Sequence, residues 1–594
     1  MNPLQKEFTT TISVRRTSWR ILLGGCLDEQ NTRIRHGFAA RDTQGFQPNR
    51  MVRISNTGVI PVKNPWLTVN DSRKGRTLDE IIAGIRRHYG PLTTKKEKML
   101  AVWRFFCDHL YDSRGGYAMS RDPVVTLNST GFAGCFHLAC LMQLVLTKMG
   151  FGKTRFIELG ELGHSLPEAY YDGRYHMIDA CLYTFFLDKT GEIAGIDDLK
   201  ENPTLTENTV HHNGPAGFDQ GPHPDYYRED IANDAIQIFP QTFHHGRTMS
   251  FELRPGESMV RFWGKQEGKY ARAMEKTPQA HKTLEPSEGD ILFNPDFKKI
   301  PCEEIFDSFR NVRFDARRRL MCPGTPGVTS ELVLKTTSPY IITGATLEFS
   351  YFKHSGDARF SVDILVEYPE WTHFGLKHWK EIYHDRGGNG HIVKKIMLDE
   401  HVASCNEDMG LRFEYLLRFS MLDQSAGLNI GLHGFKLTTH IQCATYYLPA
   451  LSLGNNRIEY TDDTPATDGK QVEVEFQWQE CHDIKPPSPP RLLAPANGAY
   501  LSLAHPVFSW EPADDTEVKD YHIQDSEYAN CKWPVSPNFE RYISRTRFSG
   551  QKRWEPLSTV GLRKGSVYYW WLRSLSKSDV WSAWSKARRF TVKG

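Results

Sequence analysis

The chain lacks long apolar runs, a strong charge of either sign and clustered cysteines. No stretch of its 594 residues approaches the ~18 continuous apolar residues that a membrane-spanning helix needs, so we expect no membrane span. With 73 basic and 71 acidic side chains the formal net charge is only +2, and we expect no nucleic-acid partner. The 11 cysteines contain no CxxC pair and are not densely spaced, so the sequence leaves the redox compartment open.

The N-terminus carries a faint export pattern. Arg15-Arg16 precede a short apolar run, Ile21 to Gly25, that ends at Cys26 and resembles an export signal with a lipid-attachment cysteine. The alternative is the start of an ordinary strand. Because β modules on a proline-rich linker are common in extracellular bacterial enzymes, the sequence favours an exported or cell-surface location by analogy, without a clear signal peptide.

What the chain does contain indicates several domains, since 594 residues exceed one hydrophobic core. Helical periodicity begins after Thr77, and the stiff segment Pro486–Pro490 is typical of a linker. We expect an N-terminal β segment over 1–76 that packs on the core, and an α+β domain over 77–247. A β-sandwich region over 248–484 and a further β unit over 485–594 follow.

One segment of the expected α+β domain contains a candidate nucleophile. Gly131–Gly134 forms a glycine-bearing turn that leads into a helix from Cys135, with Gly150 as its stop. The unpaired N–H groups of a first helical turn carry partial positive charge, which lowers the pKa of a thiol there and favours a developing oxyanion. Cys135 is therefore the candidate nucleophile.

A histidine and an aspartate follow on a predicted hairpin. Asp172-Gly173 favours a two-residue turn, in which paired positions sum to 345, so that Leu166 faces Asp179. His164 then lies two residues from Leu166 on the same face of the sheet, as a diagonal neighbour of Asp179. A histidine held by a carboxylate is what a Cys–His nucleophile pair requires.

These residues resemble the transglutaminase-like superfamily, in which a helix-starting cysteine is followed by strands that bear histidine and then aspartate. The resemblance covers about residues 78–200. It implies an α+β, papain-like core beside all-β sandwich domains, with Cys135 as nucleophile, His164 as base and Asp179 as its orienter. Leu166 stands where the family usually has an aromatic residue, and no upstream motif supplies the side-chain oxyanion donor. Trp103 and Asn128 are the upstream candidates for that donor.

Three further groups of residues in the sequence have interpretations other than catalysis. Histidines and an aspartate between 211 and 245 are possible metal ligands, but their spacing matches no metal motif (His211, His212, Asp219, His223, His244 and His245). Asp172 and Glu168 are expected to be turn and hairpin-surface groups. The C-terminal unit resembles a fibronectin type III module, whose aromatic residues are expected in the core or as a platform for sugars.

The sequence therefore favours a cysteine hydrolase that acts on an amide bond, a peptidase or amidase, through an acyl-thioester on Cys135. The expected substrate is a protein, peptide or glycoconjugate, and no metal or organic cofactor is needed. An amine in place of water as acceptor would make the enzyme a transferase. The alternative is a catalytically inactive scaffold whose β modules bind glycan or protein.

Overall fold

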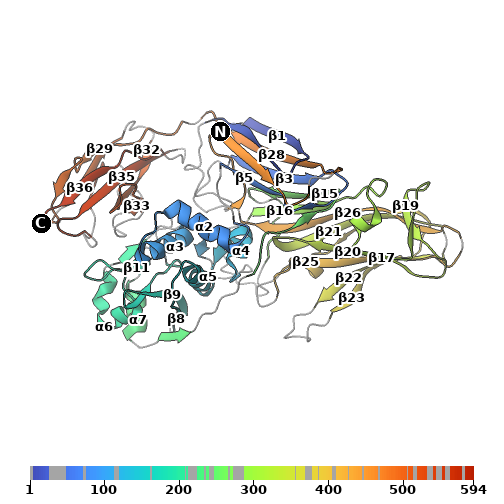
Figure 1. Cartoon of the computed structure of the whole chain (residues 1–594), viewed down its shortest axis with the longest axis horizontal. Helices are drawn as coiled ribbons and strands as arrows, with labels where there is room; N and C mark the ends of the chain where they lie inside the picture. The colour runs from blue at the N-terminus through green and yellow to red at the C-terminus, as the bar shows by residue number, and fades with distance from the viewer. Residues whose placement is uncertain are drawn as a thin grey trace.

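The computed structural model of the chain is built mainly from antiparallel strands arranged in several sheets (Figure 1). The residues that the structure describes are 4–25, 48–70, 75–112, 120–160, 163–182, 184–207, 209–211, 224–232, 236–239, 246–264, 266, 268–271, 287–354, 356–367, 377–385, 387–404, 410–425, 427–444, 447–465, 468–483, 485–504, 506–512, 518–531, 540–542, 552–555, 562–577 and 582–594.

The largest sheet joins the N-terminal strands to strands from the middle of the chain. Along its main path the order is β1 (Leu4–Ile12), β28 (Val472–Glu480), β3 (Asn49–Asn56), β15 (Glu257–Phe262), β16 (Ser287–Phe293), β26 (Ile430–Cys443), β19 (Leu320–Pro323) and β18 (Val312–Asp315). β21 (Ile341–Lys353) pairs with β26 and with β24 (Gly390–Met397). A separate sheet pairs β27 (Gly454–Thr461) with β2 (Arg16–Leu23) and β5 (Trp66–Val69). β1, β2, β3 and β5 are thus bound by backbone hydrogen bonds to strands more than 380 positions away.

A five-stranded sheet shares a second core with β21 and β26. Its order is β17 (Ser308–Arg310), β20 (Ser330–Thr337), β25 (Glu414–Leu422), β22 (Arg359–Glu367) and β23 (Lys377–His384). Burial alternates along β20 and β25, so one face of each strand is directed inward. Aromatic residues of the two sheets, among them Phe349, Phe419 and Phe435, pack in one cluster. This is a sheet-on-sheet sandwich.

The helical part of the molecule lies between Thr77 and Ala232. α2 (Leu78–Tyr89) is capped by Thr77, and α3 (Lys95–His109) begins with a reciprocal capping box between Thr94 and Glu97. α5 (Cys135–Lys148) packs on β8 (Thr154–Leu159) and β9 (His164–Tyr171). The sheet order there is β10 (Arg174–Met177), β9, β8 and β13 (Ile236–Phe239). One hydrophobic cluster runs from these helices into the N-terminal strands, which fixes the helices against the large sheet.

The C-terminal unit contains two sheets around its own core. One sheet is β29 (Arg491–Ala494), β31 (Phe508–Glu511) and β34 (Arg553–Trp554). The other is β30 (Ala499–Leu501), β36 (Arg588–Val592), β35 (Val567–Ser576), β32 (Val518–Ser526) and β33 (Glu540–Tyr542). Trp510 and Trp570 are fully buried in this core, so these two aromatic residues serve packing.

The remaining elements are short: α4 (Pro123–Val125), the π-helical turn η2 (Thr126–Thr130), α6 (Ile196–Glu201), η3 (Pro203–Glu207), α7 (Pro224–Ala232), α8 (Cys302–Ile305), α10 (Asp399–Val402), β4 (Val62–Lys63), β6 (Tyr111–Asp112), β7 (Phe132–Ala133), β11 (Thr184–Phe186), β12 (Thr209–His211) and β14 (Glu252–Leu253). The structure confirms the expectation of a multidomain chain rich in β-strands. Within the described residues no helix has both the length and the apolar character needed to cross a membrane.

Candidate active site

Cys135 lies at the start of the central buried helix. Residues Leu138 to Leu146 of α5 are buried, whereas Cys135 is partly exposed. Gly131 has φ +71, a left-handed conformation that glycine adopts without strain, and it ends η2 so that the chain can turn into β7 and α5. Gly134 at the helix N-cap has no side chain, so the first-turn N–H groups are not capped by one. The cysteine predicted to start this helix does so.

The predicted hairpin carries the histidine. β9 and β10 pair as Tyr171 with Arg174 and Glu168 with Met177, and both turn residues, Asp172 and Gly173, have positive φ. This is the register expected from the Asp-Gly turn. The ladder ends at Met177, and Asp179 forms an isolated bridge with Thr184.

The structure brings His164 and Asp179 into contact. His164 Nε2 lies 2.5 Å from Asp179 Oδ2, and the two side chains are 3% and 1% exposed. Backbone N–H groups of Cys181 and Leu182 donate to Asp179 Oδ1 at 2.8 and 2.9 Å. Burial opposes ionisation of Asp179, but His164, the Tyr227 hydroxyl and the Leu182 N–H outweigh it and lower the pKa of its carboxyl group. Asp179 is therefore a carboxylate whose orientation is fixed by these hydrogen bonds.

Cys135 reaches the same histidine. Its sulfur accepts hydrogen bonds from the Cys181 thiol and from His164, and it lies 3.7 Å from the carbonyl oxygen of Gly163. The Cys181 contact is the largest influence on the thiol; burial opposes it, and His164 and the Ser165 N–H add to it, which lowers the pKa of Cys135 to about 4. Burial lowers the pKa of His164, but Asp179 and Cys135 outweigh that effect and raise it to about 10. Both shifts favour the form in which Cys135 is a thiolate and His164 an imidazolium at neutral pH.

Tyr227 on α7 is a contact that the sequence did not indicate. Its hydroxyl donates to Asp179 Oδ2 at 2.5 Å, the same oxygen that faces His164. Tyr227 is fully buried and its ring packs edge-on against His164 and Phe186. No motif marks it, because it lies 48 residues after Asp179 on a separate short helix.

We expect Tyr227→Phe to weaken the hydrogen bonding of Asp179 without changing the arrangement of Cys135, His164 and Asp179. Asp179 keeps its contacts with His164, Cys181 and Leu182, so we expect a loss of about 1 kcal/mol in stability and a reduction of less than about twofold in the alkylation rate of Cys135 at pH 6. Iodoacetamide kinetics and thermal unfolding measure these effects. Tyr500→Phe, at a 70% exposed position of the C-terminal unit, is the control. Identical behaviour of the two variants would show that the Tyr227 hydroxyl is not needed.

Both upstream candidates for the oxyanion donor are bound elsewhere. Trp103 Nε1 donates to the backbone oxygen of Asp179 at 3.0 Å. Asn128 Nδ2 donates to the carbonyl oxygens of Gly75 and Val124 at 2.9 and 2.8 Å. Trp103 thus holds the backbone of Asp179 in place. The start of α5, where no side chain caps the N–H groups, is the candidate source of oxyanion donors.

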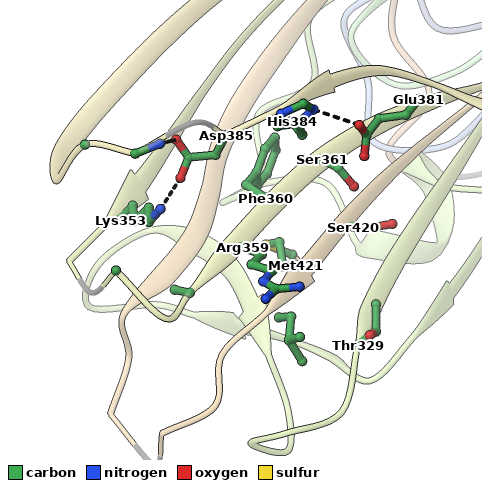
Figure 2. Close-up of a pocket in the computed structure, with 15 residues that line it drawn as sticks. Thr329, Lys353, Arg359, Phe360, Ser361, Glu381, His384, Asp385, Ser420 and Met421 are labelled. Atoms are coloured by element: carbon green, nitrogen blue, oxygen red, sulfur yellow. Dashed lines mark hydrogen bonds and ion pairs between the residues drawn. The ribbon is translucent and has the colours of Figure 1, made fainter.

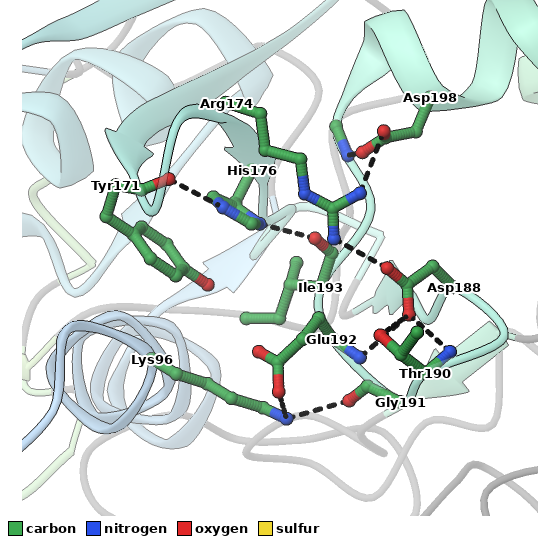
Figure 3. A network of polar contacts seen from close by, with 11 residues as sticks. Lys96, Tyr171, Arg174, His176, Asp188, Thr190, Gly191, Glu192, Ile193 and Asp198 are labelled. Carbon is green, nitrogen blue, oxygen red and sulfur yellow. Dashed lines mark hydrogen bonds and ion pairs between the residues drawn. The ribbon is translucent and has the colours of Figure 1, made fainter.

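A second layer of polar contacts holds the hairpin from outside. Figure 3 shows Arg174 between Asp188 and Asp198, with contacts of 2.6 and 2.9 Å. Lys96 of α3 donates to the carbonyl oxygen of Gly191 at 2.7 Å and pairs with Glu192. These contacts tie β10 and α3 to the chain that follows Asp179, so the position of Asp179 is fixed from several sides.

Glu168 is not a hairpin-surface group, contrary to expectation. Its side chain is fully buried, pairs with Arg155 and accepts the N–H of Ile196 at 2.7 Å. Pairing explains the difference, because a carboxylate is buried only where cations and donors satisfy it. Asp172 is in the turn, as predicted.

No group of three or more possible metal ligands occurs in the described part of the chain. Of the six possible metal ligands between 211 and 245, the structure describes only the backbone of His211, in β12. The other five lie outside the described residues (His212, Asp219, His223, His244 and His245). A thiolate beside an imidazole and a carboxylate can attack an amide carbonyl without help from a metal.

The sandwich contains a separate hollow of about 860 Å³. Figure 2 shows that Lys353, Asp385, His384, Glu381 and Arg359 line it, with Lys353 paired to Asp385 and His384 to Glu381. Phe360, the aromatic residue of this lining, is 1% exposed, so its face is not offered to a flat ligand.

Comparisons with known proteins give the chain no family. No family model matches it, and no curated protein matches its sequence. Among solved structures, β-1,2-glucanase from Parabacteroides distasonis is 12% identical over 53% of this chain and 33% of its own, with a TM-score of 0.14. The Endo-D glycoside hydrolase domain from Streptococcus pneumoniae is 8% identical over 51% and 33%, at 0.13, and the VP2 subviral particle of infectious bursal disease virus is 7% identical over 76% and 85%, at 0.19. The chain thus spans about a third of the two glycoside hydrolases, and similarity this low carries no argument about fold or function.

Proposed function

We propose that this chain is a cysteine hydrolase of transglutaminase-like type that cleaves an amide bond. The observation that carries the proposal is the unbroken line of contacts from a partly exposed sulfur through a buried imidazole to a buried carboxylate, Cys135 to His164 to Asp179. Most buried cysteines serve only packing, and their thiols stay protonated. A thiol at a helix start, beside a histidine held by aspartate, has the environment of a nucleophile.

The proposed reaction has two halves. The Cys135 thiolate attacks the amide carbonyl carbon, and the oxyanion that forms is stabilised by N–H groups at the start of α5. The His164 imidazolium donates its proton to the leaving nitrogen, the C–N bond breaks, and an acyl-thioester remains on Cys135. His164, now neutral, accepts a proton from water, the hydroxide attacks the thioester, and the released carboxylic acid restores the thiolate. Asp179 keeps the imidazole oriented throughout.

The test uses amide substrates of different classes and two acceptors. Peptides, glycopeptides and dimethylated casein are incubated with the protein, with and without a labelled primary amine, and new amino groups and incorporated label are measured. We expect release of an amine or ammonia with little incorporation of label, and no release with Cys135→Ser. Acid-quenched reactions should contain an acyl adduct on Cys135 by mass spectrometry. The absence of both adduct and release, in a protein whose Cys135 also resists alkylation, would contradict the proposal.

The hollow in Figure 2 favours a second candidate function, that of a binding protein on an inactive scaffold. Arg359 and the hydroxyls of Ser361, Ser420 and Thr329 line it, and such groups suit a polar glycan or a protein surface. Binding to a glycan array that Arg359→Ala abolishes, together with an unreactive Cys135, would favour this candidate over the enzyme.

A further inference from the structure

A second thiol lies beside the proposed nucleophile. Cys181 is 3% exposed and lies in the turn that follows Asp179, where its N–H donates to Asp179 Oδ1. A side-chain hydrogen bond with Cys181 is the largest influence on the Cys135 thiol, whose sulfur lies 3.7 Å from the carbonyl oxygen of Gly163, the residue before His164. Asp179, which accepts the Cys181 N–H, also contacts His164, so Cys181 is tied to the same polar network as the nucleophile.

Five other described cysteines differ from this pair. Burial raises the pKa of the Cys302 thiol to about 11 and also raises that of Cys322, Cys443 and Cys531. Cys140, on the same helix as Cys135, is fully buried in a different cluster with Ala139 and Phe156. Since oxidants react with thiolates, oxidation should begin at Cys135 among these cysteines.

We propose that Cys135 and Cys181 form a reversible intramolecular disulfide when hydrogen peroxide oxidises the site. This inference rests on the proposed function, because the thiolate that attacks an amide is also the group that attacks peroxide. Cys181 would then act as a resolving thiol that protects the nucleophile, and the disulfide would hold the enzyme inactive until a thiol reductant opens it.

The chemistry balances in two steps. The Cys135 thiolate attacks one peroxide oxygen, an S–O bond forms, the O–O bond breaks, and the departing hydroxide takes the proton of the His164 imidazolium to give water. Cys135 is thereby oxidised to a sulfenic acid. The Cys181 sulfur then attacks the sulfenic sulfur, the S–S bond forms, the S–O bond breaks, and the hydroxide leaves with the Cys181 proton as a second water. Two thiols and one peroxide give one disulfide and two waters.

The location of Cys181 suits such a bond. It occupies a turn after the last pair of the β9–β10 ladder, so a covalent link there leaves the hairpin pairing intact. The turn is tied to Asp179 through the N–H groups of Cys181 and Leu182, which keeps the resolving sulfur at the site while His164 and Asp179 retain their contact.

The test oxidises the full chain with hydrogen peroxide and maps its cysteines by mass spectrometry without reduction. In the wild type we expect a peptide pair joined by Cys135 and Cys181, a loss of 2 Da, and a drop of at least tenfold in iodoacetamide labelling of Cys135 that dithiothreitol reverses. In Cys181→Ser we expect sulfinic acid on Cys135, a gain of 32 Da, and no recovery with dithiothreitol. Cys302→Ser, at a cysteine in the sandwich, is the matched control and should behave as the wild type.

Labelling of the reduced protein separates this inference from the proposed function. If reduced Cys135 reacts rapidly at pH 6 but oxidation yields sulfinic acid at equal rates in wild type and Cys181→Ser, the disulfide is overturned and the nucleophile stands. If reduced Cys135 is slow and the oxidised wild type contains no joined peptide, both are overturned. The wild-type peptide map decides the matter even if Cys181→Ser fails to fold.

Discussion

Replacing His164 with alanine is expected to slow the alkylation of Cys135 at pH 6 by at least about tenfold, towards a limit of about 300-fold, because an unperturbed thiol with a pKa near ~8.5 is only ~0.3% ionised there. In the wild type the Cys181 hydrogen bond, with His164 and the Ser165 N–H, holds the pKa of Cys135 at about 4 against the effect of burial, so nearly all of the sulfur is thiolate at pH 6. Cys181 keeps its hydrogen bond in the variant, so the loss falls short of this limit, but its neutral thiol cannot replace the charge of an imidazolium. Iodoacetamide rates from pH 4 to 9, read on the Cys135 peptide, measure the change.

Cys135 and His164 together set the pH range of the proposed hydrolysis. The pKa of Cys135 is lowered, so the thiolate is lost only as pH falls through about 4. The pKa of His164 is raised, so the proton for the leaving amine is lost only as pH rises through about 10. His137→Ala, two residues after Cys135 on α5, is the control and should keep the wild-type alkylation profile. A wild-type rate that rises only near pH ~8.5, as expected of an unperturbed thiol, would contradict the ion pair.

Much of the site followed from local sequence rules. The Asp172-Gly173 turn fixed the register of β9 and β10, since a two-residue turn leaves one pairing for every later position. Gly131 and Gly134 marked the entry to α5, and Gly150, with φ +96, marked its exit. These features depend on residues close together in the chain, and such residues are visible in one sequence.

Contacts between distant segments were not visible in the same way. The pairing of β1 with β28 joins residues more than 450 positions apart, and alternation within a strand does not identify its partner. Tyr227 and Cys181 were missed because each acts through a hydrogen bond across the fold rather than through a spacing motif. The burial of Glu168 depends on Arg155 of the neighbouring strand β8, and no local pattern in the sequence indicates that β8 pairs with β9.

Asp179→Asn is expected to reduce the alkylation rate at pH 6 and the proposed hydrolysis by about 10²- to 10⁴-fold with only a modest loss of stability. The backbone N–H groups of Cys181 and Leu182 can only donate, so the amide oxygen of asparagine must face them, and its NH₂ group then faces His164 and Tyr227. The Tyr227 hydroxyl can rotate to accept, and His164 can accept at Nε2 if its proton moves to the other ring nitrogen.

That tautomer presents an N–H to Cys135 and cannot take a proton from water, so the site keeps its shape and loses its base. Because most hydrogen bonds are retained, we expect a stability loss of about 1–3 kcal/mol, measured by thermal or denaturant unfolding. Asp172→Asn is the matched control: it makes the same substitution at a left-handed turn position that asparagine accepts, and both properties should stay at wild-type values. Rapid alkylation of Asp179→Asn at pH 6 would show that Cys181 and the helix start alone lower the pKa of Cys135. Asp179 would then be a structural residue.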